Sequence, residues 1–248
     1  MKKNLIIVWI LLASLLWWVV FGWDFFVPIS NQSNIPRLYN PVSWFYEPKS
    51  QEEIDLEVIS RMDLYSDDSL QKLLDDNHPL SANYNAKDIV NINSDFTFNR
   101  SSNFSLRKEA AEKFAAMARA FSHAFNFKAK LSINSARRSP TYQRQLASNC
   151  SVWRCAKPWT SEHEAGLALD LWVNGWNIKA WNWMYYQWLL DNAHKYGFHN
   201  SYQKWIDIDG KIIEPRHWRY VWVDLATILH NNNQSFIEYF YKNIEPKK

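Results

Sequence analysis

The stretch Ser161-Glu162-His163-Glu164-Ala165-Gly166-Leu167-Ala168-Leu169-Asp170 sets a histidine and an aspartate seven residues apart around a tight glycine turn. After Gly166, leucines alternate with small or polar residues, and a period of two predicts a strand. The leucines of this strand should face the core. Asp170 then shares the other face with Ala168, whose small side chain leaves room for an ion. The stretch therefore predicts two ligands, His163 and Asp170, of a metal site.

A second stretch, Glu214-Pro215-Arg216-His217-Trp218-Arg219-Tyr220, supplies the missing parts of that site. A catalytic zinc ion usually has three protein ligands, drawn from histidine and carboxylate, and a fourth position open to water. His217 completes such a set. Glu214 is the carboxylate that we expect to act as general base, because zinc lowers the pKa of its water toward about 7. Glu214 and His217 are three residues apart, and such residues face opposite ways on a regular strand. A bend at Pro215 is therefore needed to bring both side chains to the metal.

An arginine follows the strand that we expect over residues 128–134, where apolar and polar residues alternate. Peptide hydrolysis passes through an oxyanion, and removing a donor to such an oxyanion typically costs about 10² to 10³ in rate. Arg138 is always charged and is the best candidate for that donor. Pro140 suits the first turn of the helix that should come next.

The remaining pattern predicts an α+β domain, with a small, mainly antiparallel sheet flanked by helices and the zinc site at the sheet. A helix is expected over residues 105–126, with Ser105 as its N-cap, because apolar residues recur there at helical spacing. Another should run over 179–196 and end at Gly197. A strand is expected around 212–222. Two closing helices should follow, near 224–230 and 235–242.

The N-terminus predicts a membrane anchor over residues 1–23. Two lysines precede an uncharged, strongly apolar run of roughly 20 residues, which is long enough to cross a bilayer as a helix. It lacks the small-residue cleavage site of a signal peptide, so an uncleaved anchor is favoured over a cleaved signal. The lysines place the start in the cytoplasm and the rest of the chain outside it. Residues 24–67, rich in proline, are expected to form an arm, and 68–248 the catalytic domain.

The overall charge and the cysteines limit the classes of partner. A net charge of +3 without a cluster of lysine or arginine argues against a nucleic-acid partner. Cys150 and Cys155 are the only cysteines. In an exported chain they could close a short disulfide loop, but two free thiols are equally compatible with the sequence.

Three motifs, at residues 135–143, 161–170 and 214–221, together resemble those of the zinc D-alanyl-D-alanine carboxypeptidases of the VanY type, with the related L,D-carboxypeptidases and VanX-type dipeptidases. The resemblance implies zinc ligands at His163, Asp170 and His217, with Glu214 as base and Arg138 at the scissile carbonyl or the substrate carboxylate. It also implies positions near the substrate for Ser139, Gln143 and Ser161. The chain departs from the family pattern at Arg216, where tryptophan is usual, and at Trp222, where glycine is usual.

The resemblance implies an enzyme with one Zn²⁺ per chain that removes the terminal D-amino acid, D-Ala, from peptidoglycan stem peptides. Together with the predicted anchor, this gives a membrane-anchored enzyme on the extracytoplasmic side. The sequence leaves open whether the cleaved bond is D-Ala-D-Ala or L-Lys-D-Ala. Two other functions stay open as well. The same centre would suit a peptidoglycan L,D- or D,D-endopeptidase, and a tethered module could bind the wall without catalysis.

Overall fold

The computed structural model describes residues 48–98, 103–178, 183–203 and 211–245. The predicted membrane anchor and most of the predicted arm lie outside these residues. Among the described residues, no helix combines the length and the apolar character that a membrane span requires. The compact unit described below begins at Lys49.

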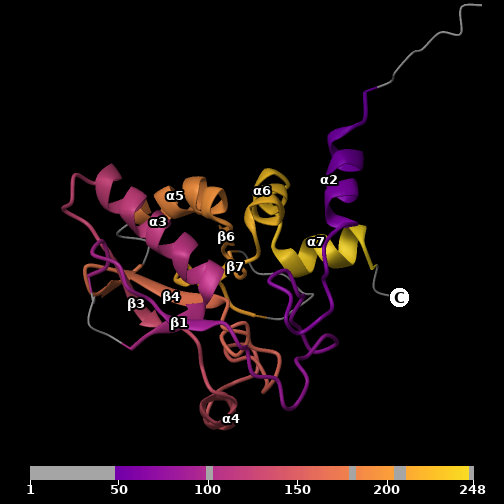
Figure 1. Cartoon of the computed structure of the whole chain (residues 1–248), viewed down its shortest axis with the longest axis horizontal. Coiled ribbons are helices and arrows are strands. Elements are labelled where there is room, and N and C mark those ends of the chain that lie inside the picture. The colour runs from indigo at the N-terminus through magenta and orange to yellow at the C-terminus, as the bar shows by residue number, and fades with distance from the viewer. Residues whose placement is uncertain (1–47, 99–102, 179–182, 204–210, 246–248) are drawn as a thin grey trace, which may run out of the picture. The chain divides into compact units, whose positions relative to one another are not determined.

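A five-stranded antiparallel sheet forms the centre of this unit. Strands β3 (Leu131–Ser135), β4 (Ala168–Val173), β7 (His217–Tyr220) and β6 (Phe198–His199) lie in that order, and β5 (Trp176–Asn177) pairs with β4. A second sheet joins β1 (Ile89–Asn91) to β2 (Ser105–Arg107). In the view of Figure 1, α3 (Lys108–Ala124) and α5 (Trp183–Asn192) lie above the larger sheet and α4 (Pro140–Ser148) lies below it. The predicted α+β architecture with an antiparallel sheet is confirmed.

Strand β4 has the two faces that its period of two predicts. Leu167, Leu169 and Leu171 are at most 1% exposed and belong to the main core cluster. On the same strand, Asp170 stands directly opposite His217 of β7. Facing residues of an antiparallel pair hold their Cβ atoms about 5 Å apart on one face of the sheet. The register of β4 and β7 therefore brings the aspartate and the second histidine together.

The helix over residues 105–126 begins later than predicted. Ser105 is not an N-cap, because it pairs with Asn91 in the ladder between β1 and β2. Helix α3 starts at Lys108, after an Arg107 that makes no side-chain cap. The predicted strand around 212–222 is also shorter, because only His217–Tyr220 pairs with its neighbours. In both places, backbone pairing with a distant segment sets the boundary.

The later helices agree with the sequence in their described parts. Residues 179–182, the start of one predicted helix, lie outside the described residues. Helix α5 continues as a 3₁₀ helix, η2 (Ala193–Tyr196), and stops at Gly197, whose φ of 80° is the left-handed C-cap that was predicted. Helices α6 (Val223–Asn231) and α7 (Phe236–Asn243) follow as expected.

A second core cluster joins the C-terminal helices to α2 (Gln51–Ile59). Ile59 and Leu64, which fall within the predicted arm, are 4% and 3% exposed in this cluster. Helices α2 and α7 each begin with a capping box, formed by a serine and the glutamate three residues later. The packed unit therefore includes the last part of the segment that the sequence assigned to the arm.

A stacked pair of histidines predicts that acid destabilises the fold. The ring of His194 in η2 lies 3.8 Å from that of His230 in α6, with 14° between their planes. Burial, then the charges of His230 and Lys195, lower the pKa of His194 from 6.5 to about 4, against the opposing charge of Asp191. Because the folded pKa is the lower one, stability is complete above pH 6.5 and is lost as the pH falls toward 4.

Protonation of His194 should lower the free energy of unfolding by at most about 2 kcal/mol at pH 5, which corresponds to a fall of a few degrees in Tm. Thermal unfolding at pH 7 and pH 5 measures it, and His194→Phe should reduce the difference between the two pH values. An equal fall of Tm in the wild-type protein and the variant would assign the acid sensitivity to other groups.

Candidate metal centre and its cavity

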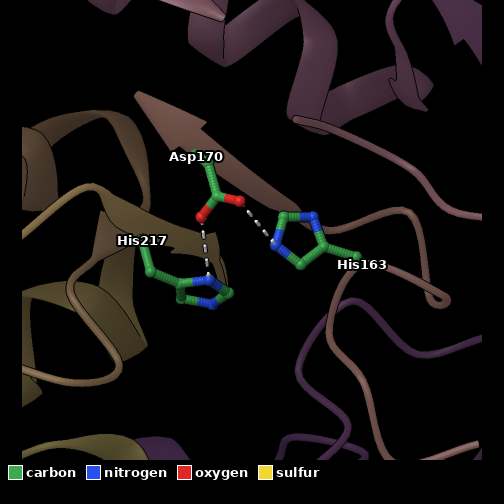
Figure 2. A group of neighbouring side chains, drawn as sticks. All are labelled: His163, Asp170 and His217. Carbon is green, nitrogen blue, oxygen red and sulfur yellow. Dashed lines mark ion pairs between the residues drawn. The ribbon is translucent and has the colours of Figure 1, made fainter. Parts of the chain in front are cut away.

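Three buried side chains from different parts of the fold converge at one point. His163 comes from the turn before β4, Asp170 from β4 and His217 from the start of β7. Their candidate ligand atoms all lie within 4.8 Å of one another, and each residue is at most 4% exposed. Figure 2 shows both imidazole rings directed at the carboxylate of Asp170. The structure thus brings together the three residues that the sequence predicted as zinc ligands.

The neighbours of each ring identify the nitrogen that faces the metal. Nδ1 of His163 is 2.7 Å from the carbonyl oxygen of Ala136, which can only accept, so this nitrogen donates and Nε2 is left for the metal. His217 is oriented the other way. Its Nε2 donates to Oε2 of Glu162 at 2.7 Å, so its Nδ1 faces the site. Nε2 of His163 and Nδ1 of His217 lie 3.6 and 3.5 Å from the two oxygens of Asp170.

The donor set fits a zinc ion. Two imidazole nitrogens and one carboxylate oxygen are typical ligands of catalytic zinc. Oδ1 of Asp170 is buried and has no hydrogen-bond partner, which an ion at the centre of the cluster would supply. Although burial opposes its ionisation, the neighbouring histidines hold the pKa of Asp170 well below its ordinary range. The carboxylate is therefore charged whenever a cation can bind.

His217 lies between two carboxylates, and these favour a positive charge at its ring. Burial opposes protonation, but the hydrogen bonds and charges of Asp170 and Glu162 raise the pKa of His217 to about 9. His163 behaves differently, because burial lowers its pKa. A proton and a metal ion compete for the same nitrogen of a ligand histidine. The same arrangement of charge that attracts a proton to His217 attracts a divalent cation.

Glu162 supports the centre from behind, and the sequence did not single it out. Its fully buried carboxylate accepts from Nε2 of His217, from Nη1 of Arg219 at 2.9 Å and from Oγ of Ser201 at 2.7 Å. Although burial opposes ionisation, Arg219 and then His217 hold the pKa of Glu162 well below its ordinary range. The carboxylate therefore fixes the orientation of His217. The sequence predicted a supporting role for Arg219, and this contact agrees with it.

Replacing Glu162 should weaken the metal site without removing a ligand. We expect Glu162→Gln to lower zinc affinity about 10- to 100-fold, the usual effect of losing a group that orients a ligand histidine. Competition with a chromophoric chelator measures the affinity. Glu164→Gln is the matched control, because Glu164 lies in the same turn but accepts from the backbone of Trp159 rather than from a ligand. Equal zinc affinity in the Glu162→Gln variant and the wild-type protein would remove Glu162 from the centre.

The bend that Glu214 needs is present. The amide of His217 donates to the carbonyl of Glu214 at 3.1 Å, so residues 214–217 form a turn that contains Pro215. The side chains of Glu214 and the three ligands line one cavity of about 350 Å³. Nη2 of Arg216 lies 3.2 Å from Oε1 of Glu214, and its Nε lies 3.7 Å from Oδ1 of Asp170. The turn therefore places the predicted base beside the centre.

Arg138 also lines this cavity, and three hydrogen bonds fix its guanidinium. It donates to Oδ2 of Asp170 at 3.0 Å, to Oγ of Ser135 at 3.1 Å and to Oε1 of Gln143 at 3.4 Å. Burial lowers the pKa of Arg138, and the charge of Asp170 opposes this effect. A guanidinium fixed beside a metal ligand can donate to an oxygen that gains negative charge there.

The three residues predicted near the substrate differ in position. Ser161 is buried and lines the cavity. Gln143 is buried and does not line it, and its amide nitrogen donates to the carbonyl of Ala156 while its oxygen accepts from Arg138. Ser139 is exposed, and its hydroxyl caps α4 by accepting from the amide of Tyr142. The structure thus brings Ser161 to the site, gives Gln143 a contact with Arg138 and does not bring Ser139 to the cavity.

The two departures from the motif pattern have different consequences. Arg216 places a second arginine beside Asp170 and Glu214, as described above. Trp222 lies outside the cavity and has a φ of 78° and a ψ of 155°, a conformation that glycine adopts and other residues rarely do. The first departure therefore concerns the site and the second concerns backbone strain.

The two cysteines form a disulfide, which resolves the alternatives that the sequence left open. Cys150 and Cys155 are bonded, with their Cα atoms 6.0 Å apart. The loop that they close contributes Trp153, Arg154 and Cys155 itself to the cavity lining. The disulfide thus belongs to the wall of the site.

Sequence comparisons agree with the motifs. A family profile described as "VanY: D-alanyl-D-alanine carboxypeptidase" matches residues 103–223. The putative carboxypeptidase YodJ of Bacillus subtilis is 31% identical over 189 residues, which cover 71% of this chain and 68% of that protein. A D-alanyl-D-alanine carboxypeptidase of Enterococcus faecalis is 34% identical over 96 residues, 38% of this chain. The matched part spans only 35% of the length of the Enterococcus protein.

Solved structures share the fold. The LdcB LD-carboxypeptidase superposes with a TM-score of 0.63 and 27% identity, over 72% of this chain and 88% of that one. A Zn(II) complex of the vancomycin resistance D,D-pentapeptidase VanY gives a TM-score of 0.55 at 22% identity, over 68% of this chain and 97% of that one. The second likeness supports the fold alone, since the identity is low.

Proposed function

Because the chain belongs to the VanY family of zinc carboxypeptidases, we propose that it removes the terminal D-amino acid from peptidoglycan stem peptides. One observation carries the proposal. The His163, Asp170 and His217 cluster opens into the same cavity as Glu214 and Arg138, so a metal site, a base and a fixed cation meet where a peptide can enter. A module that only binds the wall has no need of the base.

The residues of the cavity can be given distinct roles in hydrolysis. His163, Asp170 and His217 would hold the zinc, which would act as a Lewis acid and would lower the pKa of a bound water. Glu214 takes a proton from the attacking water and delivers it to the amine nitrogen as the peptide bond breaks. Arg138 donates to the carbonyl oxygen as that oxygen gains charge. The water thus adds to the carbonyl carbon, its proton passes through Glu214 to the nitrogen, and the C–N bond breaks. The products are a new carboxyl group on the stem peptide and a D-amino acid with a free amine.

Arg216 is suited to bind the terminal carboxylate of the peptide. In a carboxypeptidase substrate this carboxylate lies within one residue of the cleaved carbonyl, a reach of about 4 Å between Cα atoms. Arg216 lies within 4 Å of Glu214 and of Asp170, so its guanidinium stands beside the proposed base and a proposed metal ligand. It forms charge-assisted hydrogen bonds with carboxylates readily. We assign it the carboxylate of the D-amino acid that leaves.

Digestion of purified muropeptides tests the proposed activity. We expect the zinc-loaded protein to release one alanine from a stem peptide and to leave cross-linked dimers joined, as followed by mass spectrometry. Comparing pentapeptide with tetrapeptide stems separates cleavage of a D-Ala-D-Ala bond from cleavage between the third residue and D-Ala. Separation of cross-linked dimers would instead identify an endopeptidase. Binding without any cleavage in zinc-replete buffer would identify a wall-binding module.

We also propose that residues 1–23 anchor the enzyme in the cytoplasmic membrane, with the catalytic domain on the extracytoplasmic side. The support is the uncharged apolar run after the N-terminal lysines. A disulfide at Cys150 and Cys155 suits an oxidising compartment. Protease treatment of intact spheroplasts should digest the domain and leave cytoplasmic markers intact. Recovery of the full chain after such treatment would contradict this orientation.

A further inference from the structure

The loop closed by Cys150 and Cys155 is a fixed wall of the cavity. Its backbone is held by contacts from two other segments, in addition to the disulfide. Nζ of Lys211 donates to the carbonyls of Val152 and Cys155, and the amide of Ile212 donates to the carbonyl of Trp153 at 3.1 Å. On the other side, Gln143 of α4 donates to the carbonyl of Ala156 at 2.9 Å. The loop can therefore present side chains in defined positions.

Arg154 is the cation that this loop presents. Its guanidinium carbon lies 5.6 Å from the centre of the Trp153 ring, and both side chains line the cavity. The other two arginines of the cavity, Arg138 and Arg216, each lie within 4 Å of a carboxylate oxygen of Asp170. Within the ranges that the structure describes, Arg154 has no carboxylate partner. Among the described residues, Arg154 is therefore the one arginine of the cavity that no carboxylate pairs with.

Arg154 lines the cavity but forms no ion pair with the carboxylates that we assign to the reaction. Those carboxylates, Asp170 and Glu214, pair with Arg138 and Arg216 instead. The terminal carboxylate of the substrate lies within one residue of the cleaved bond, beside those two arginines. An anion that reaches Arg154 must then belong to another part of the peptide. A side-chain carboxylate on the residues before the cleaved bond has the required chemistry.

We propose that Arg154, held by the disulfide loop, binds a side-chain carboxylate of the stem peptide, so that the enzyme prefers diaminopimelate to lysine as the third residue. The inference rests on the proposed function and names its substrate class. Lysine and diaminopimelate differ by that one carboxylate, which makes two stem peptides a matched pair. Because Arg154 is exposed, this contact should give a preference of only a few-fold, as roughly expected for an exposed ion pair.

Binding to a variant that cannot cleave provides the test. Glu214→Ala, as the zinc-loaded full chain, is titrated with two stem peptides that differ only in diaminopimelate or lysine at the third position. We expect the diaminopimelate peptide to bind roughly three- to fivefold more tightly. Adding Arg154→Gln should weaken that peptide alone and make the two affinities equal. Arg144→Gln is the matched control, since Arg144 lies on α4, donates to Thr141 and does not line the cavity.

Two results would overturn the inference. Equal affinity of the two peptides for the Glu214→Ala protein would show that the third-residue carboxylate is not recognised. An equal effect of Arg154→Gln on both peptides would show that Arg154 acts on something else. Neither result depends on hydrolysis. Failure of the wild-type protein to release alanine would contradict the proposed function, while the binding preference would still decide the role of Arg154.

The disulfide gives a second, independent test. If the loop positions Arg154, Cys150→Ala combined with Cys155→Ala should raise KM for the diaminopimelate peptide about as much as Arg154→Gln does. Zinc content should stay at the wild-type level, which also shows that the domain is folded. An unchanged KM in the double cysteine variant would mean that the hydrogen bonds from Lys211, Ile212 and Gln143 hold the loop without the disulfide, and the role assigned to the disulfide would be withdrawn.

Discussion

Glu214→Ala should lower kcat by about 10³-fold while the protein keeps its zinc. A positioned general acid or base contributes about 10² to 10⁴ to the rate, and Glu214 is the one carboxylate in the described cavity lining that neither joins the metal cluster nor supports a ligand. Its carboxylate instead pairs with Arg216 at 3.2 Å. The loss should therefore fall on the chemical step and leave the three ligands in place. Elemental analysis and steady-state kinetics on a stem peptide measure both quantities.

The Glu214→Gln variant distinguishes the role of the Glu214 carboxylate as a base from the effect of the size of its side chain. Glutamine keeps the size of the side chain and can still accept from Arg216, but it cannot take the proton from water. Both variants should therefore lose kcat to a similar degree, and only the alanine variant should change the position of Arg216 and hence KM. Near-normal turnover by the glutamine variant would mean that another group is the base. Loss of zinc from either variant would mean that Glu214 binds the metal.

The parts of the fold that the sequence predicted correctly depend on neighbouring residues along the chain. The alternation around Asp170 defined both faces of β4, because three leucines are buried on one of them. The left-handed conformation of Gly197 ended η2 as predicted. Ser105 shows the limit of such reasoning. A serine before an apolar periodic run is a normal cap signal, but pairing with Asn91, a partner that the sequence did not indicate, decided its structure.

The same contrast explains the site. The ligands could be predicted because their residue types are specific and the register of β4 and β7 brings two of them together. Glu162 was missed because its role depends on Arg219 and Ser201, which are distant in sequence. One signal was present. Arg219 lies two residues after His217, so on a strand both side chains share a face, and a buried arginine behind a ligand requires a carboxylate. Glu162, next to His163, was available for that role.

Asp170→Ala should remove the zinc and all detectable peptidase activity. Two histidines then remain as ligands, one fewer than catalytic zinc sites use. The carboxylate also contacts Arg138 and Arg216, so its removal leaves a largely buried guanidinium without its partner. Breaking a buried pair from one side costs about 3 kcal/mol, which for a domain of this size lowers Tm by several degrees. Zinc stoichiometry, activity and thermal unfolding are the three measurements.

Metal-stripped wild-type protein is the reference that separates the two effects of this substitution. It lacks zinc but keeps the contacts of Asp170 with Arg138, Arg216 and the two histidines, so a Tm above that of Asp170→Ala measures the loss of these contacts without the loss of the metal. Asp170→Asn refines the comparison, since its amide oxygen can still accept from Arg138 while its neutral side chain is a poor zinc ligand. We expect its Tm to lie between the other two and its zinc content to be close to that of Asp170→Ala. Full zinc occupancy in either variant would contradict the ligand assignment, because the charge of Asp170 is what makes this cluster a site for a divalent cation rather than a buried pair of histidines.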